Sequence, residues 1–134
     1  MIMVDTSSPM AIFLQETDAS THAERIEHDD QPLMSAASVL EASIVIRNAK
    51  TLSIAHAEAW LDEMILVFDI KIEAVTVEQM RIARIAHMTF GKGTGHPAQL
   101  TFGDCFAHAL AKASSAPLPF KGDDFGRTDI ERTL

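Results

Sequence analysis

The sequence predicts an α/β domain with a mainly parallel sheet. Short apolar runs alternate with longer stretches of helical periodicity, which is the pattern of strands connected by helices. The length of 134 residues fits one domain, so residues 1–134 are expected to form a single unit. Hydrophobic residues make up 47% and charged residues 22%, which is ordinary for a globular protein and argues against disorder.

The expected elements follow from periodicity and from helix-start residues. Ser8 caps the first helix with Pro9 in its first turn, Ser35 or Ser38 caps the third, and Thr76 with Gln79 forms a capping box. In chain order we expect a strand at Ile2–Val4, helices over Ser8–Leu14 and Ala19–His28, a strand at Leu33–Met34, helices to about Asn48 and over Ile54–Phe68, a strand at Ile70–Val75, a helix over Val77–Phe90, a loop over Gly91–Leu100, a helix from Thr101 or Phe102 to Ser114, a strand at Pro117–Lys121 and a turn over Gly122–Asp124.

Acidic residues follow two of the expected strands. Asp5 comes directly after the first strand, and the pair Asp123 and Asp124 follows the fourth. In open α/β sheets, ligands bind outside the carboxyl ends of the strands. Two acidic positions from distant parts of the chain are therefore expected at one edge of the sheet.

Two further acids stand in apolar surroundings. Glu41 is the only charge in the stretch SAASVLEASIVI, and Asp104 is the only charge between Lys92 and Lys112. A carboxylate among apolar groups costs free energy unless it is paired or bound to a metal. Asp104 also falls in a first helical turn, where the macrodipole favours an anion. We expect Asp5, Glu41, Asp104 and Asp123 to converge on one cavity.

Each acid also has a plain structural interpretation. Asp5 and Asp104 could be turn or helix-start residues, and Asp123–Asp124 could be an ordinary turn. Glu41 could form a buried ion pair with Arg47 or Arg127. The combined set is harder to explain in this way than any single member.

An all-oxygen ligand set is typical of Mg²⁺ or Mn²⁺ rather than zinc. These ions activate water and stabilise charge on a phosphoryl group, which points to phosphodiester hydrolysis. The net charge of −8 disfavours general nucleic-acid binding. That objection weakens if five of the carboxylates face a metal.

The segments MIMVDTS, SAASVLEASIVI, GKGTGHPAQLTFGDCFAHALAKA and LPFKGDDFGRTDI resemble the PIN-domain ribonucleases, specifically the VapC-type toxins of bacterial toxin–antitoxin pairs. The resemblance spans nearly the whole chain, and the stretch from Gly91 to Ile130 is its most specific part. It implies a three-layer α/β/α sandwich with a mainly parallel sheet. It also implies an acidic Mg²⁺ or Mn²⁺ site that cuts RNA, commonly a structured RNA such as tRNA.

The resemblance further implies a homodimer and a cognate VapB-like antitoxin whose C-terminal segment blocks the site. By motif, the catalytic and metal-binding acids are Asp5, Glu41, Asp104 and Asp123, with Asp124 as a neighbouring ligand. Ser8–Pro9, Thr101 and His108 depart from the family pattern without removing an expected ligand. His108, one turn beyond Asp104, could alter substrate contacts.

Several other residues are candidates for binding RNA. The candidates are Thr6, Lys92, Lys121 and Arg127, with capping an equal alternative for Thr6. The histidines lack metal-ligand spacing, and most are expected at the surface. Cys105 is expected to be a small core residue.

The single cysteine and the absence of any bilayer-length apolar run favour a cytoplasmic protein without membrane contact. Two alternatives to a toxin stay open. One is a PIN-type nuclease that acts in RNA processing or on DNA without an antitoxin. The other is a catalytically silent module that binds RNA or a protein.

Overall fold

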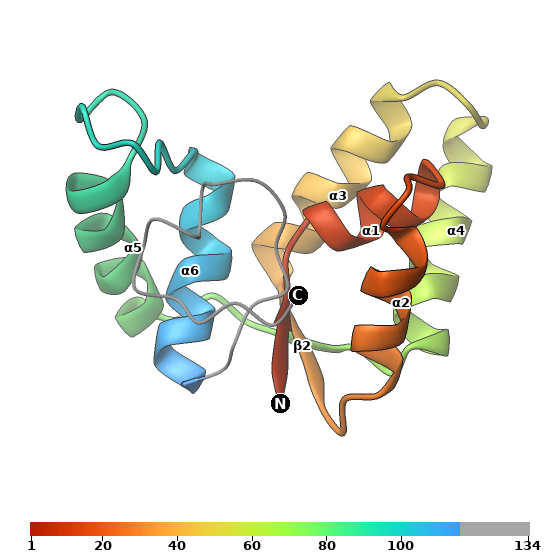
Figure 1. The fold of residues 1–134 in the computed structure, drawn as a ribbon, viewed down its shortest axis with the longest axis horizontal. Coiled ribbons are helices and arrows are strands. Elements are labelled where there is room, and N and C mark those ends of the chain that lie inside the picture. Colours follow the sequence, from red (N-terminus) through yellow and green to blue (C-terminus); the bar gives the residue numbers. More distant parts are fainter. Residues whose placement is uncertain (116–134) are drawn as a thin grey trace.

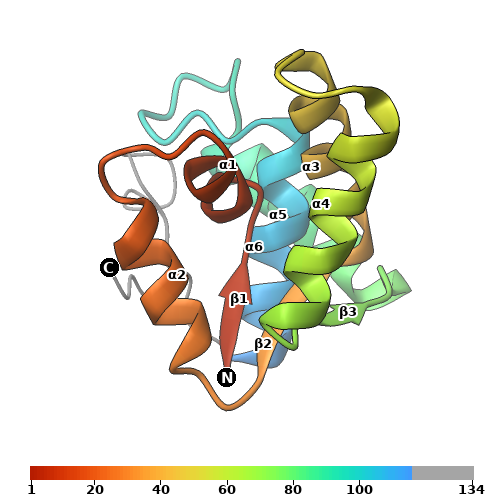
Figure 2. The ribbon, with the colours of Figure 1, turned by 90° about the vertical axis from the view of Figure 1, so that its right-hand side faces the viewer.

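A three-stranded parallel sheet forms the centre of the molecule, seen in a computed structural model that describes residues 1–115. The strands are β1 (Ile2–Val4), β2 (Pro32–Ser35) and β3 (Lys71–Glu73), in the order β1-β2-β3. Ile2 pairs with Pro32, and Leu33 pairs with Lys71. All three strands therefore end at the same edge, where α1 and α3 begin (Figure 2).

Helices cover both faces of the sheet, as Figure 1 shows, with α5 and α6 on one side and α1 to α4 on the other. The helices are α1 (Ser7–Phe13), α2 (Ala19–Glu27), α3 (Ala36–Asn48), α4 (Ile54–Val67), α5 (Val77–Phe90) and α6 (Phe102–Ser114). This arrangement is the expected α/β/α sandwich. None of these helices, within residues 1–115, is long and apolar enough to cross a bilayer.

Alternation along the strands divides the core into two layers. Met3 and Leu33 pack with α6 residues such as Leu110, whereas Val4 and Met34 pack with residues of α2, α3 and α4. Successive side chains of a strand point to opposite faces, so a three-residue strand can contribute to both layers. Ile2, Met3 and Val4 are fully buried, which explains why their run lacks polar residues.

Most predicted boundaries agree with the structure to within one or two residues. Ser35 caps α3 by accepting a hydrogen bond from Ala37 N–H at 3.2 Å, and Thr76 caps α5 through Gln79 N–H at 3.1 Å. The third strand is shorter than the predicted Ile70–Val75. The predicted strand Pro117–Lys121 and turn Gly122–Asp124 lie outside the described residues.

The prediction that Ser8 caps the first helix was wrong. The helix begins at Ser7, and Ser8 is fully buried with its hydroxyl 2.7 Å from His22 Nδ1. Pro9 does stand in the first turn, where its missing N–H costs no helical hydrogen bond. At the chain start, the Met1 ammonium lies 3.2 Å from Asp29 Oδ1 and fastens the beginning of β1.

Candidate metal and nuclease site

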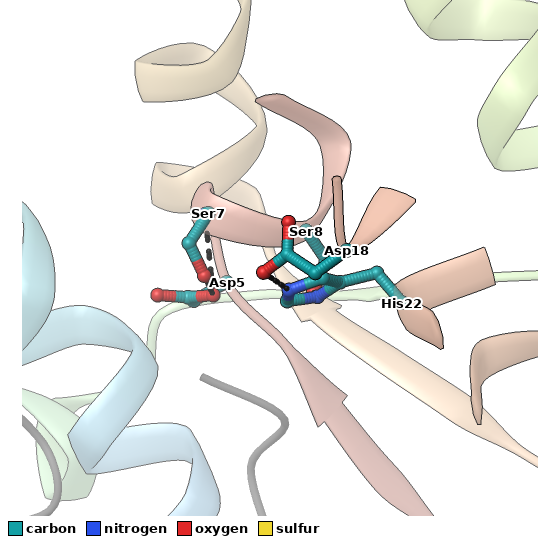
Figure 3. Close-up of polar contacts among 5 residues, drawn as sticks. All are labelled: Asp5, Ser7, Ser8, Asp18 and His22. Carbon is teal, nitrogen blue, oxygen red and sulfur yellow. Dashed lines mark hydrogen bonds and ion pairs between the residues drawn. The ribbon is translucent and has the colours of Figure 1, made fainter. Parts of the chain in front are cut away.

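Asp5 occupies the carboxyl end of β1 and is buried, with 6% of its surface exposed. Its Oδ1 accepts two hydrogen bonds from Ser7, one from the backbone N–H at 3.2 Å and one from the hydroxyl at 2.6 Å (Figure 3). Within residues 1–115, Oδ2 accepts no hydrogen bond. Asp5 therefore holds one oxygen fixed and presents the other to a ligand.

Burial raises the pKa of Asp5 to about 7. The Ser7 hydroxyl bond acts in the opposite direction, while the negative charges of Asp104 and Glu41 raise the pKa further. A cation bound beside this carboxyl would favour its ionised form, so metal binding would release the proton. The contributions of Asp104 and Glu41 also indicate that each of these two acids lies within electrostatic reach of Asp5.

Glu41 lies on α3 and is held by Thr6. The Thr6 hydroxyl donates to Glu41 Oε1 at 2.5 Å and also lies 3.4 Å from the Ser38 carbonyl. The hydroxyl proton of Thr6 is thus used to orient Glu41, and a direct contact of Thr6 with substrate stays a prediction.

The alternative pairing of Glu41 with Arg47 is not found. Arg47 Nε pairs instead with Glu58 Oε1 of α4 at 3.0 Å. Arg127, the other alternative partner, lies outside the described residues. The Glu41 carboxylate is therefore not neutralised by Arg47.

Gly103 allows α6 to approach Glu41 closely. A Cβ atom at position 103 would overlap the Glu41 carboxylate. Because glycine lacks this atom, the first turn of α6 can lie against the Glu41 carboxylate. Gly103 is thus a residue of the site whose contribution is the absence of a side chain.

Asp104 lies in the first turn of α6, as expected, and also caps that helix. Its Oδ2 accepts the Thr101 N–H at 2.9 Å, and its own N–H donates to Thr101 Oγ1 at 3.3 Å, which forms a complete capping box. The carboxylate is therefore oriented by the helix start, while its charge still reaches Asp5.

The described residues fit an open site for Mg²⁺ or Mn²⁺. Within residues 1–115, no three His, Cys, Asp or Glu side chains form a group that could hold a metal alone. Mg²⁺ is often bound through one or two carboxylates and retains several waters, so a closed protein cage is not required. The buried Ser38 hydroxyl has no hydrogen-bond partner among these residues, and the Ser38 carbonyl lies 3.4 Å from the Thr6 hydroxyl. Asp123 and Asp124 lie outside the described residues.

The remaining candidates divide between surface and interior. Lys92 is exposed in a loop that is closed by backbone bonds from Lys92 N–H to Leu100 O and from Leu100 N–H to Phe90 O. Lys121 and Arg127 lie outside the described residues. Cys105 is buried, and burial followed by the charge of Asp104 raises its pKa to about 11, which agrees with a core residue.

Four of the six histidines lie at or near the surface, as expected for most of them, and His22 and His108 are buried. His108 is 3% exposed and its ring centroid lies 5.9 Å from that of Phe90, so it packs in the core, and an influence on substrate contacts stays a prediction. His22 is fully buried between Ser8 and Asp18. The sequence offered one signal for His22, its place on the apolar side of an otherwise polar helix beside Ile26.

An apolar groove of about 450 Å³ opens next to Glu41, between α3 and α6. Asp5 and Asp104 do not line it. The groove is lined by Ala37, Leu40, Glu41, Ile44, Val45, Phe102, Gly103 and Phe106. Leu40 and Phe102 are 60% and 79% exposed, so α3 and α6 both present large apolar side chains to solvent here.

Comparison with known proteins places this geometry in a family. Residues 2–131 match the PIN domain. The chain is 44% identical over 133 residues to Ribonuclease VapC28 of Mycobacterium tuberculosis, covering 99% of this chain and 98% of that protein. Ribonuclease VapC42 of the same organism is 36% identical over 129 residues, or 96% of each chain. The chain therefore belongs to the VapC ribonucleases of the PIN-domain family.

Solved structures share the fold at low sequence identity. VapC20 of Mycobacterium tuberculosis, described as a toxin that cleaves the sarcin–ricin loop, matches with a TM-score of 0.77 at 15% identity, covering 99% of this chain and 98% of that one. VapBC2 of Rickettsia felis, bound to a DNA fragment from its promoter, matches with a TM-score of 0.75 at 15% identity, covering 98% and 96%. These likenesses establish the architecture of the sheet and its helices.

Proposed function

We propose that this chain is a metal-dependent endoribonuclease, the toxin of a type II toxin–antitoxin pair, working in the cytoplasm. The observation that carries the proposal is the buried Asp5 within electrostatic reach of Glu41 and Asp104 at the carboxyl edge of the sheet. Asp123, with Asp124 beside it, is the proposed fourth acid. A structured RNA such as tRNA is the proposed substrate.

Each described acid has a distinct part in the proposed mechanism. Mg²⁺ or Mn²⁺, when bound, supplies an activated water and stabilises charge on the phosphoryl group. Asp5 offers Oδ2, because Ser7 holds Oδ1. Glu41 is oriented by Thr6, and Asp104 by its capping box with Thr101. Lys92, Lys121 and Arg127 are the proposed contacts to RNA phosphates.

The test is cleavage of end-labelled structured RNA by purified protein with Mg²⁺, Mn²⁺ or EDTA. We expect cleavage with either metal, none in EDTA, and loss of at least about 100-fold in Asp5→Asn and Glu41→Gln. Metal-independent cleavage that leaves a 2′,3′-cyclic phosphate would rule out this mechanism. Tight RNA binding without cleavage would favour a catalytically silent binding module. RNA cleavage together with the absence of a neighbouring antitoxin gene would favour a nuclease of RNA processing.

The apolar groove beside Glu41 is the proposed seat for the antitoxin. An apolar peptide segment fits its lining, and an arginine from that segment suits an acidic site because its guanidinium can bind carboxylates in bidentate geometry. Several structural neighbours are toxin–antitoxin complexes, among them one from Klebsiella pneumoniae. We expect rising Mg²⁺ to weaken an inhibitory peptide, and an Arg→Ala change in the peptide to weaken it as well. Inhibition insensitive to both would place the antitoxin elsewhere.

The homodimer implied by the family resemblance is also a proposal. The exposed Phe102 and Leu40 flank the same groove, so a second copy and an antitoxin could compete for it. Sedimentation velocity with and without the inhibitory peptide distinguishes the two occupants.

A further inference from the structure

A buried polar chain links α2 to the site through α1. His22 Nδ1 lies 2.7 Å from the Ser8 hydroxyl, and His22 Nε2 lies 3.3 Å from Asp18 Oδ2. Ser8 and His22 are both fully buried. Figure 3 shows the three side chains beside the Ser7–Asp5 contact, so the chain of contacts leads from α2 to the carboxyl end of β1.

Ser8 and Asp18 suit one neutral tautomer of His22. An ionised carboxylate such as that of Asp18 only accepts hydrogen bonds, so its contact with His22 requires a hydrogen on Nε2. Nδ1 of the neutral ring is then an acceptor, and the Ser8 hydroxyl donates to it. The hydroxyl is thereby aimed at the histidine, which ties the first turn of α1 to α2.

This trio does not make a catalytic serine. Ser8 and His22 have no exposed surface, so no substrate reaches the hydroxyl. Furthermore, the site described above stands three residues away, at Asp5, and uses Ser7 instead of Ser8. The Ser8, His22 and Asp18 side chains therefore have a structural part: they fix how α1 and α2 lie relative to each other.

The orientation of α1 affects Asp5 because of where Ser8 lies in the chain. Ser8 follows Ser7, whose N–H and hydroxyl both donate to Asp5 Oδ1. Both donors depend on how the start of α1 is turned relative to β1. The N-cap position of α1, Thr6, makes no side-chain capping bond, so the helix start needs support from elsewhere. Ser8 and His22 supply it.

Stability alone gives no reason for a polar pair here. Buried polar groups must be hydrogen-bonded to avoid a cost, and an apolar pair of similar volume often serves a core equally well. A fully satisfied polar pair instead selects one arrangement of the two helices.

We propose that His22 is a positioning residue for Asp5: through Ser8 it fixes the first turn of α1, so that Ser7 holds Oδ1 of Asp5 and leaves Oδ2 for the metal. This inference rests on the proposed function of Asp5 as a metal ligand. It assigns to α2, which contributes no acid to the site, a defined part in building it.

Two substitutions at His22 separate its contacts. His22→Asn places an amide oxygen where Nδ1 stands and can still accept from Ser8, whereas His22→Gln places an amide nitrogen where Nε2 stands and keeps only Asp18. Ser8→Ala removes the same bond as His22→Gln. His28→Asn is the matched control, because His28 lies at the end of the same helix, is exposed, and bonds to the Glu24 carbonyl at 2.7 Å.

The measurements are the Mn²⁺ dissociation constant by calorimetry, the melting temperature in EDTA, and kcat and KM for RNA cleavage. We expect His22→Gln and Ser8→Ala to weaken Mn²⁺ binding by about threefold to tenfold and to lower kcat with KM unchanged, below the roughly 10- to 100-fold of a residue that touches a ligand directly. His22→Asn and His28→Asn should bind Mn²⁺ within about twofold of wild type.

A double variant keeps the test informative if single changes disturb folding. Ser8→Ala combined with His22→Phe replaces the polar pair by an apolar one, and a merely structural role predicts full recovery of Mn²⁺ binding together with the melting temperature. We expect the melting temperature to recover and Mn²⁺ binding to stay weak. Recovery of both, or wild-type Mn²⁺ binding in His22→Gln and Ser8→Ala, would overturn the inference.

Asp5→Asn distinguishes this inference from the proposed function. If Asp5→Asn abolishes Mn²⁺ binding while the His22 and Ser8 variants bind normally, the positioning role alone is wrong. If Asp5→Asn binds Mn²⁺ as well as wild type does, the metal site itself is wrong.

Discussion

At the scale of single residues, Asp104 serves two purposes that sequence alone presented as alternatives. Its carboxylate completes a capping box, and its charge acts on Asp5. One side chain can do both because a helix start orients the carboxylate without neutralising it.

We expect Asp104→Asn to abolish cleavage while the domain stays folded. Its amide oxygen can still accept the Thr101 N–H, and removing one of several like charges relieves repulsion in the metal-free protein. The loss of a favourable charge at a helix start, roughly 0.3–1 kcal/mol, acts in the other direction. The unfolding free energy in EDTA should therefore change by less than about 1 kcal/mol. A folded variant that cuts RNA at the wild-type rate would remove Asp104 from the ligand set.

The buried carboxyl of Asp5 makes the stability of the metal-free protein depend on pH. Its folded pKa of about 7 exceeds the unfolded value of about 3.9. The stability that its protonated form contributes is therefore fully present below pH about 4 and is lost as the pH rises through about 7. We expect the melting temperature in EDTA to fall between pH 5 and pH 8, and Asp5→Asn to reduce that slope.

Metal should reverse the effect, because a cation binds the ionised carboxylate. The rise in melting temperature on adding Mn²⁺ should consequently be larger at pH 8 than at pH 5.5. An Asp5→Asn variant with the same pH slope and the same response to Mn²⁺ as wild type would contradict this.

At the scale of elements, the start of α6 is shaped by Gly103. Replacing a glycine inside a helix by alanine usually gains up to about 1 kcal/mol of helix propensity. Here the new Cβ would overlap the Glu41 carboxylate, which is the movable end of a long side chain. We expect Gly103→Ala to keep its melting temperature within a few degrees and to lose most of its cleavage activity, because Glu41 leaves Thr6.

Glu41→Gln is the matching control for that experiment, since it keeps the shape of the side chain and removes its charge. Similar losses in Gly103→Ala and Glu41→Gln would assign the effect to Glu41. Full activity in Gly103→Ala would show that the position of the Glu41 carboxylate does not matter.

Element positions were largely predictable, and contacts between distant elements were not. The helix starts at Ser35, Thr76 and Thr101 can be recognised from the local sequence, because a capping side chain bonds to a residue two or three positions away. Ser8 has the same local appearance, yet its hydroxyl bonds to His22 in another helix. The acidic candidates could be named from the sequence. The contact of Thr6 with Glu41 depends on how α1 meets α3, and the need for Gly103 depends on how α6 meets α3.

At the scale of the molecule, the charge of the described residues, 1–115, is divided between the two sides of the sheet. Residues 1–76, which include α1 to α4, carry thirteen acidic and four basic side chains, whereas residues 77–115, with α5 and α6, carry two acidic and four basic ones. Arg81, Arg84 and Lys92 are exposed and take no part in the ion pairs found within residues 1–115. An RNA backbone should therefore approach over α5.

We expect Arg81→Glu and Arg84→Glu each to raise KM for RNA on the order of fivefold at low salt, and less at high salt, where screening is stronger. Lys50→Glu is the control, because it makes the same charge change at the end of α3, on the acidic side. Equal effects of all three variants would mean that net charge, and not the α5 face, governs RNA binding.

The order in which the three described acids enter the chain has a consequence for synthesis. Asp5 and Glu41 are made early, and Asp104 arrives with α6, which packs against β1 and β2. A nascent chain on the ribosome therefore exposes an unfinished site until α6 has emerged. The ribonuclease site thus cannot form before α6 has left the ribosome, and products truncated before α6 lack Asp104.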